Sequence, residues 1–343
     1  MTIKESLPIS ELTTMKLGGK ARYVINITSK DELSTAYNFA KEQNLPTYIV
    51  AGGSNIIAKD EDYNGVILLN NIKGIRTTKE SNSTIKFEVG SGEVLDDVCA
   101  NVSKKGFTGM EAMSAIPGTI GGAVIQNSGA YGQDISKILV SVEAYDISAR
   151  KNITIPKHKI EYGYRNSIFN SSKKGRYFIT AVCVKLKKGE IKGELYRSLQ
   201  GYLDDNNIAE RTPNIIRQAV SNIRANKLPD PKLAPSAGSF FYNVTVTAQE
   251  KKIFLKKYPD APVYKIGAQW EIASAWLIEQ VGLKGRTLHG FKISETAPLV
   301  LIKKSADSYA DLAAAREEIK SAVNEKFGIT LQQEPEEITY FKC

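Results

Sequence analysis

The feature that most constrains this chain is the eight-residue run 116–123, which contains three glycines and otherwise small or aliphatic side chains. This run is too poor in side chains to fill a core and too rich in glycine for a strand interior. We therefore expect its backbone to lie against a flat, anionic ligand. The next residues, 125–132, are polar and flanked by glycine, and their amides suit a heterocycle edge and a pyrophosphate. The sequence predicts a cofactor cradle here.

A second glycine turn, residues 51–55, follows a short predicted strand over 46–50. Taken alone, this segment is better interpreted as an ordinary tight turn than as a ligand-binding loop. Neither glycine segment matches a common nucleotide fingerprint. No G-x-G-x-x-G follows a strand, and Gly18-Gly19-Lys20 continues with Ala21 rather than Ser or Thr.

The length and charge of the chain limit its class. A chain of 343 residues exceeds what one hydrophobic core usually supports, so two or three domains are expected. The contents of 42% hydrophobic and 24% charged residues are those of an ordinary globular protein. The net charge of +9 favours anionic partners. No nucleic-acid-binding motif accompanies it, so no nucleic-acid partner is expected.

The three cysteines and two histidines form neither a CxxC pair nor a Cys/His cluster. We therefore expect no metal site and no disulfide framework, which fits a reducing cytoplasm. The amino terminus lacks an apolar leader, and no segment approaches the roughly 20 apolar residues of a membrane helix. The expected location is the cytoplasm, with no membrane partner.

Hydrophobic patterns predict a mixture of strands and helices along the chain. In the first half, strands are expected at 22–27, 46–50, 65–69, 84–89, 138–145, 159–164 and 177–186. Helices are expected at 29–42, which opens with a capping box, and at 93–105, which Gly106 ends. A polar connection, 187–207, precedes a helix capped by Thr212, and the prolines of 228–231 mark a domain boundary. Further helices are expected at 248–257, 273–281 and 309–327, with a strand at 299–302.

Three short segments carry side chains that are candidates for catalysis or ligand binding. Arg165 follows two tyrosines and is either a surface arginine or a fork for a carboxylate or phosphate. Ser239 lies between a glycine and two aromatic residues without a G-x-S-x-G elbow, so it is either a turn serine or an acid-base group outside a hydrolase triad. The acidic turn 334–337 is either solvated or directs one carboxylate inward.

Seven motifs in this order resemble those of the UDP-N-acetylenolpyruvoylglucosamine reductase family, and they extend over nearly the whole chain. They are residues 14–19 (TMKLGG), 51–55 (AGGSN), 115–132 (AIPG to QNSGAYG), 162–167 (YGYRNS), 228–231 (LPDP), 237–243 (AGSFFYN) and 334–336 (EPE).

The resemblance implies an α+β fold with a two-part FAD-binding domain of the vanillyl-alcohol-oxidase type and a smaller α+β substrate-binding domain. The implied parts are 1–70, with 337–343 as a candidate return to it, then 71–228, and a substrate domain at 229–336. In this family NADPH reduces noncovalently bound FAD. The enolpyruvyl group of UDP-N-acetylglucosamine enolpyruvate is then reduced to UDP-N-acetylmuramate, a peptidoglycan precursor. A monomer is expected.

The resemblance also assigns roles to residues. Ser239 matches the proton donor, Arg165 the carboxylate-binding arginine, and Glu336 the supporting carboxylate. Substrate contacts are expected from Tyr131, Tyr164, Tyr196, Lys227 and Asn243, with Tyr196 on a loop that closes over the UDP group in one branch of the family. The expected cofactor contacts are Gly52, Gly53, Ser54, Asn55, Pro117, Gly118, Thr119, Gly121, Gly122, Gln126, Asn127, Gly129 and Ala130.

Two other functions remain open from the residues alone. One is a different FAD-dependent oxidoreductase with the same fold. Such enzymes often tether flavin through a histidine, but neither His158 nor His289 lies in a glycine-rich motif. The other is a noncatalytic protein that binds flavin or a nucleotide sugar, which has no reason to keep Arg165, Ser239 and Glu336 together.

Overall fold

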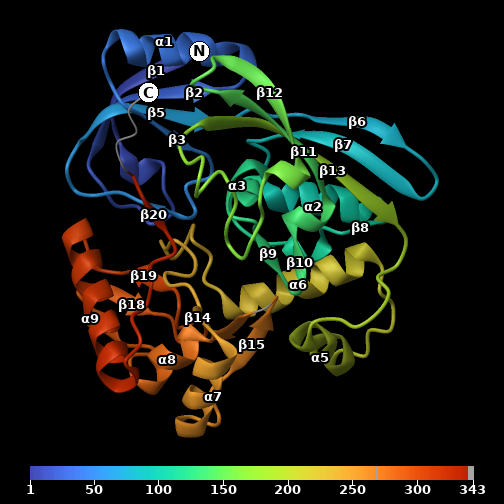
Figure 1. Cartoon of the computed structure of the whole chain (residues 1–343), viewed down its shortest axis with the longest axis vertical. Coiled ribbons are helices and arrows are strands. Elements are labelled where there is room, and N and C mark those ends of the chain that lie inside the picture. Colours follow the sequence, from blue (N-terminus) through green and yellow to red (C-terminus); the bar gives the residue numbers. More distant parts are fainter. Residues whose placement is uncertain (268, 339–343) are drawn as a thin grey trace.

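The first part of the fold is a four-stranded sheet near the amino terminus, drawn in blue in Figure 1. The computed structural model describes residues 1–267 and 269–338. The strand order is β1-β2-β5-β3, in which β1 is antiparallel and the others are parallel. Their bounds are Thr2–Pro8 (β1), Lys20–Ile27 (β2), Tyr63–Asn70 (β5) and Thr47–Val50 (β3).

Helix α1, Leu33–Glu42, makes the crossover between parallel strands β2 and β3. It begins where the sequence predicts. The side chain of Ser29 accepts from the Asp31 amide, and the carboxylate of Glu32 accepts from the Ser29 amide, which forms a capping box. Residues 30–32 form a 3-10 turn before the α-helix, because the first helical hydrogen bonds tighten at the cap.

The second part is an antiparallel sheet in the order β12-β11-β13-β7-β6, with the short β8 also pairing with β13. The long central strand β13 allows this width, since it pairs with three neighbours. In chain order the strands are Ile75–Glu80 (β6), Thr84–Gly90 (β7), Phe107–Thr108 (β8), Leu139–Asp146 (β11), Lys151–Pro156 (β12) and Tyr177–Lys188 (β13).

Helices α2 (Leu95–Lys104) and α3 (Ile120–Ile125) pack against the second sheet and share its hydrophobic core (Figure 1). The short hairpin β9–β10 (Gly129–Ala130 and Gln133–Asp134) and helix α4 (Ile135–Ile138) follow α3. The run 120–125 is helical because the hydroxyl of Thr119 caps its amino end by accepting from the Gly122 amide.

A third part follows two helices, α5 (Arg197–Asp205) and α6 (Pro213–Lys227). It contains two small antiparallel sheets, in the orders β14-β16-β15 and β17-β18-β19, and three helices. The bounds of these elements are Val244–Val246 (β14), Ala248–Lys257 (α7), Val263–Ile266 (β15), Gln269–Ile272 (β16), Ser274–Gln280 (α8), Thr287–Leu288 (β17), Phe291–Ile293 (β18), Leu301–Lys303 (β19) and Tyr309–Phe327 (α9).

The chain crosses between the first and third parts twice. Met15 and Leu17, from the amino-terminal segment, are buried in the core of the third part. Near the other end, β20 (Glu336–Glu337) leaves the third part and pairs in parallel with β4 (Ile56–Ile57) (Figure 1). The three-part division at 70/71 and 228/229 stays a prediction. Its proposed return segment, 337–343, lies mostly outside the described residues.

The predicted helices are confirmed to within a few residues, and α7 and α9 have the expected bounds. The predicted strand at 159–164 is wrong. That segment contains a 3-10 turn, Lys157–Lys159, and left-handed backbone at Glu161 and Arg165 (φ 55° and 50°), which a strand cannot accommodate. The polar connection 187–207 contains helix α5, whose buried Leu199 and Leu203 are too few to show a period. No helix among the described residues has both the length and the apolar character needed to cross a membrane.

Phe178 joins the first two parts and provides a test of this architecture. Its side chain is fully buried, and it packs with Tyr145 against residues of α1 and the first sheet. We expect Phe178→Ala to lower the free energy of unfolding by about 3 to 5 kcal/mol, because a large cavity opens between the sheets. Urea denaturation measures this change. Ile75→Ala, at an exposed position of β6, is the control and should change stability by less than about 0.5 kcal/mol. Equal effects would show that the two sheets do not share this core.

Candidate functional site

A large cavity lies between the first and second parts of the fold. It encloses about 1350 Å³, part of it open to solvent. The turn after β3 forms one wall, and the glycine-rich run before α3 forms another. Tyr242 and Glu336 reach it from the carboxyl-terminal third of the chain. All three parts of the fold therefore contribute to one cavity.

Close backbone contact explains the glycines at 52, 53 and 118. A Cβ on Gly52 would lie 2.7 Å from the Cα of Gly118, and a Cβ on Gly53 would lie 2.0 Å from the carbonyl oxygen of Leu12. Gly118 has a φ of +104°, which strains any other residue. The two glycine segments, predicted separately from the sequence, thus touch each other at the wall of the cavity.

The second glycine pair serves two purposes. Gly121 allows close packing on Ser91, since a Cβ there would lie 2.8 Å from the Ser91 carbonyl oxygen, which the Gly121 amide also contacts at 2.9 Å. The amide of Ile120 similarly donates to the Glu93 carbonyl. These two amides therefore hold the fold together instead of facing a ligand. A Cβ on Gly122, by contrast, would meet only the Thr119 hydroxyl, at 3.6 Å, so the cavity wall is open there.

Ten of the thirteen expected cofactor residues line this cavity. Side-chain hydrogen bonds tie them together: the Ser54 hydroxyl donates to the Pro117 carbonyl (3.3 Å), and Asn55 Nδ2 donates to Gln126 Oε1 (2.8 Å). The ten are Gly52, Gly53, Ser54, Asn55, Pro117, Gly118, Thr119, Gly121, Gly122 and Gln126. A small-side-chain wall between aromatic and amide groups fits a flat ring and a pyrophosphate.

The other three expected residues, Asn127, Gly129 and Ala130, are not among the residues lining the cavity. Asn127 Nδ2 donates to the carbonyl of Gly163 (3.0 Å), and its Oδ1 accepts from the amide of Ser136. Gly129 and Ala130 form the short strand β9, which pairs with β10. Asn127 therefore supports the loop that carries Arg165, a role that the motif alone did not indicate.

Several lining residues of this cavity were missed from the sequence. Tyr48 and Tyr177 provide aromatic surfaces, Asn70 an amide, and Lys174 a cation that pairs with Glu336 at 3.2 Å. Burial raises the pKa of Tyr48, so its phenol stays neutral. Tyr48 lies within a predicted strand, and Lys174 lies in a lysine pair without any motif, so neither carried a recognisable signal.

A second cavity, of about 730 Å³ including space open to solvent, adjoins the first, since Tyr242 lines both. Tyr164, Arg165 and Asn243, three of the predicted functional residues, line it. Val244, Thr245, Thr330 and Gln332 complete the lining. Burial raises the pKa of Tyr242 to about 12, so it separates the two cavities as a neutral phenol.

Arg165 pairs with Glu334 in this structure. Its Nε lies 3.5 Å from Glu334 Oε1, and both side chains are largely buried. Burial raises the pKa of Glu334, and the Arg165 charge partly opposes this shift. Glu336, expected to support Arg165, instead pairs with Lys174, and its amide donates to the Asn55 carbonyl. Two of the three carboxylates of the acidic turn therefore have different partners: Glu334 pairs with Arg165, and Glu336, which lines the large cavity, pairs with Lys174.

A buried carboxylate that the sequence gave no reason to select lies near Arg165. Glu271 on β16 accepts from Asn243 Nδ2 at 3.2 Å and is hydrogen-bonded to the Tyr164 phenol. Burial raises the pKa of Glu271. Burial and then the charge of Glu271 raise the pKa of Tyr164 to about 12. Glu271 thereby connects two expected substrate contacts, Tyr164 and Asn243.

Ser239 lies on an extended segment next to the acidic turn. It forms an isolated bridge with Val300, and its neighbour Phe240 accepts a hydrogen bond from the Glu334 amide at 3.0 Å. The amide of Tyr242 likewise donates to the Gln332 carbonyl at 2.9 Å. Ser239 is half-buried and is not among the residues lining the two cavities. The main chain nevertheless brings it alongside the segment that carries Glu334.

The remaining expected substrate residues lie further out. Tyr131 and Tyr196 meet edge to face, with ring centroids 5.7 Å apart, and Tyr196 is half exposed at the start of α5. Burial raises the pKa of Tyr131. Lys227 is exposed at the carboxyl end of α6, where its carbonyl accepts from the Thr296 hydroxyl at 2.6 Å. The structure does not bring these residues into contact with Arg165.

Comparisons with known proteins agree with this arrangement. Residues 21–149 match the sequence model of an FAD binding domain, and residues 230–338 match that of the UDP-N-acetylenolpyruvoylglucosamine reductase C-terminal domain. The chain is 32% identical over 331 residues to the UDP-N-acetylenolpyruvoylglucosamine reductase of Burkholderia vietnamiensis, covering 96% of this chain and 95% of that protein. It is also 32% identical to the reductase of the same name from Neisseria gonorrhoeae, covering 97% and 96%.

The fold has a solved counterpart. The crystal structure of UDP-N-acetylenolpyruvylglucosamine reductase from Thermus caldophilus superposes with a TM-score of 0.67 at 21% identity, covering 99% of this chain and all of that one. The expected fold class is confirmed: an α+β protein with an FAD-binding domain of the vanillyl-alcohol-oxidase type. Sequence similarity over nearly the whole length shows that the chain belongs to the UDP-N-acetylenolpyruvoylglucosamine reductase family.

Proposed function

We propose that this chain reduces the enolpyruvyl group of UDP-N-acetylglucosamine enolpyruvate to UDP-N-acetylmuramate, with NADPH as the reductant and FAD as the hydride carrier. This reaction supplies a peptidoglycan precursor. The observation that carries the proposal is the shared wall at Tyr242. A glycine-walled cavity suited to FAD adjoins a second cavity that holds Arg165. A reducing cofactor and an anionic substrate can therefore lie next to each other.

Ten lining residues of the large cavity hold FAD in this proposal, and the open wall at Gly122 leaves room for it. When bound, FAD supplies the hydride that it has received from NADPH. This hydride adds to the terminal carbon of the vinyl ether, and the electron pair moves onto the adjacent carbon and into the substrate carboxylate. The protein has to stabilise that charge and then deliver one proton.

Arg165 stabilises the developing charge. Glu334 contacts the guanidinium through Nε, and in this proposal the two Nη groups bind the substrate carboxylate bidentately. A donor set in place before the charge appears is worth roughly 3 to 4 kcal/mol. The left-handed backbone at Arg165 (φ 50°) supports the assignment, since strained conformations are retained where a side chain must be aimed.

Ser239 donates the proton to the adjacent carbon, and Glu336 supports the substrate carboxylate or relays the proton. A serine hydroxyl can do this without a histidine because the carbanion is far more basic than an alkoxide. The solvent then returns a proton to the serine. Tyr131, Tyr164, Tyr196, Lys227 and Asn243 bind the nucleotide sugar, and Tyr196 lies on a loop that orders over the UDP group.

We further propose a monomer in the cytoplasm, divided at 70/71 and 228/229, with FAD bound noncovalently. The last point is supported by the histidines. Neither lies along the large cavity, and His289 pairs with Glu318 at the surface. Acid precipitation of the purified protein should release free FAD into the supernatant, measured by its absorbance and mass. Yellow colour that stays with the pellet would contradict noncovalent binding.

Ser239→Ala tests the proton donor. FAD binding and reduction by NADPH should survive, because the hydroxyl acts only after hydride transfer. Reoxidation by the enolpyruvyl sugar should fall about 10²- to 10⁴-fold, since a general acid contributes that much. Stopped-flow absorbance follows the flavin band in each half-reaction, and Ser239→Cys should restore part of the rate. If Ser239→Ala reoxidises as fast as the parent protein, Ser239 is not the acid.

Glu334→Gln and Glu336→Gln separate the roles of the two carboxylates. Glu334→Gln should mainly raise KM for the sugar, because Arg165 loses the charge that fixes its guanidinium. Glu336→Gln should mainly lower the rate of reoxidation. Steady-state and stopped-flow kinetics on the same preparations give both parameters. The opposite pattern would exchange the two roles and make Glu334 the supporting carboxylate.

A further inference from the structure

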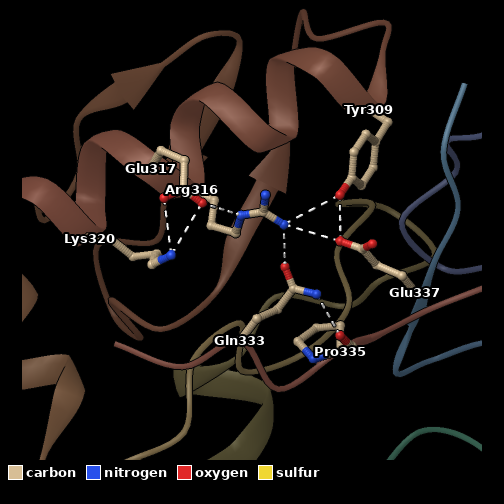
Figure 2. Close-up of polar contacts among 7 residues, drawn as sticks. All are labelled: Tyr309, Arg316, Glu317, Lys320, Gln333, Pro335 and Glu337. Atoms are coloured by element: carbon tan, nitrogen blue, oxygen red, sulfur yellow. Dashed lines mark hydrogen bonds and ion pairs between the residues drawn. The ribbon is translucent and has the colours of Figure 1, made fainter. Parts of the chain in front are cut away.

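Helix α9 contacts residues 333–337, which comprise Gln333 and the acidic turn, chiefly through Arg316. Figure 2 shows its guanidinium between Tyr309, Gln333 and Glu337. Nη1 of Arg316 donates to Gln333 Oε1 (2.8 Å) and to Glu337 Oε1 (3.2 Å). It also approaches the Tyr309 hydroxyl at 3.4 Å, and that hydroxyl donates to Glu337. One cation on the helix thus binds two positions of the turn.

The contacts made by α9 involve alternate residues of the turn. Gln333 and Glu337 bind Arg316, and Gln333 Nε2 donates to the carbonyl of Pro335 at 2.8 Å (Figure 2). The residues between them face the site: Glu334 pairs with Arg165, and Glu336 lines the large cavity. This division follows from extended backbone, in which successive side chains point to opposite faces.

The main chain anchors this segment at both ends, through the bridge between Phe241 and Gln333 and the ladder between β4 and β20. The amide of Glu334 donates to the Phe240 carbonyl, and that of Glu336 to the Asn55 carbonyl, both at 3.0 Å. Pro335 between them has no amide hydrogen to add. The two bonds also go to different parts of the fold, because Phe240 belongs to the third part and Asn55 to the first. Side-chain contacts add to these main-chain anchors and bear on the directions in which Glu334 and Glu336 point between them.

We infer that Arg316 is a positioning residue, which holds residues 333–337 so that Glu334 faces Arg165 and Glu336 faces the cofactor cavity. The inference rests on the roles proposed above for these two carboxylates. Arginine suits the task because its planar fork reaches several acceptors at once, whereas lysine offers a single compact charge. The guanidinium is well sheltered, with 19% of the side chain exposed, so its bonds are screened less than surface ion pairs.

The same helix offers a matched control. Lys320 pairs with Glu317 at 3.0 Å, one turn further along α9, and Glu317 is more than half exposed. Lys320 contacts no residue of the turn among the interactions of the described residues (Figure 2). Arg316→Met and Lys320→Met each remove one cation and keep an aliphatic stem. They differ in whether the acidic turn loses its anchor.

The test compares both half-reactions of the full-length, FAD-loaded variants by stopped-flow absorbance. We expect Arg316→Met to leave reduction by NADPH nearly unchanged and to slow reoxidation by the enolpyruvyl sugar roughly 10- to 100-fold, the cost of a small misplacement of catalytic groups. Arg316→Lys should recover only part of this loss. Lys320→Met should match the parent protein in both half-reactions. A merely structural role would instead lower the melting temperature and slow both half-reactions alike.

Each other outcome has a definite meaning. If Glu334→Gln and Glu336→Gln do not affect the sugar half-reaction, the proposed roles of the carboxylates fail, whatever Arg316 does. If those variants are impaired but Arg316→Met reoxidises like Lys320→Met, the positioning inference is wrong. If Arg316→Met does not retain FAD, Gln333→Leu replaces it, since this change removes one neutral link to the same guanidinium. Gln333→Leu should then slow the sugar half-reaction selectively, and a normal rate would overturn the inference.

Discussion

The backbone contact between Gly52 and Gly118 is the constraint on which the rest of this structure depends. The first glycine lies in the turn after β3 of the first sheet, and the second precedes α3, which packs on the antiparallel sheet. Side chains at these positions would push the two segments apart, since a Cβ on Gly52 would lie only 2.7 Å from the Cα of Gly118. The cavity keeps its shape because no side chain stands between the two walls.

The second requirement is that three separate segments converge on one arginine. Arg165 occupies a tight loop that Asn127 supports, Glu334 arrives from the carboxyl-terminal turn, and Glu271 comes from a small sheet of the third part. Burial raises the pKa of both carboxyl groups, Glu334 and Glu271, and the charge of Arg165 opposes that shift in each. The position of the guanidinium is therefore set by contacts from several segments of the chain.

How much of this could be predicted from the sequence depends on the kind of signal. Helices α7 and α9 were predicted to the residue. Thr247 caps α7 and Ser308 caps α9, and α9 ends before Gly328, which has a left-handed conformation. Helix α5 was missed because it buries only two leucines and so lacks a period.

Motifs indicated most of the cofactor wall. Lys174 and Glu271 carried no local pattern, and only long-range packing places them at the site. The same limit explains Glu334 and Glu336. The sequence shows three acids in one turn, but not which of them meets the arginine.

The two crossings between the first and third parts make these parts inseparable. Met15 and Leu17 complete the hydrophobic core of the third part, while the strand at 336–337 completes a ladder with β4 in the first. A chain cut at residue 230 would leave the carboxyl-terminal fragment without three buried side chains of its core, Met15, Leu17 and Ile57, and would leave β4 in the amino-terminal fragment without its strand partner. Exchange of the substrate-binding part between relatives must therefore carry residues 14–17 along with it. The carboxyl-terminal region therefore depends on residues 14–17, a segment more than two hundred positions earlier in the chain than Ser236, which Thr14 contacts.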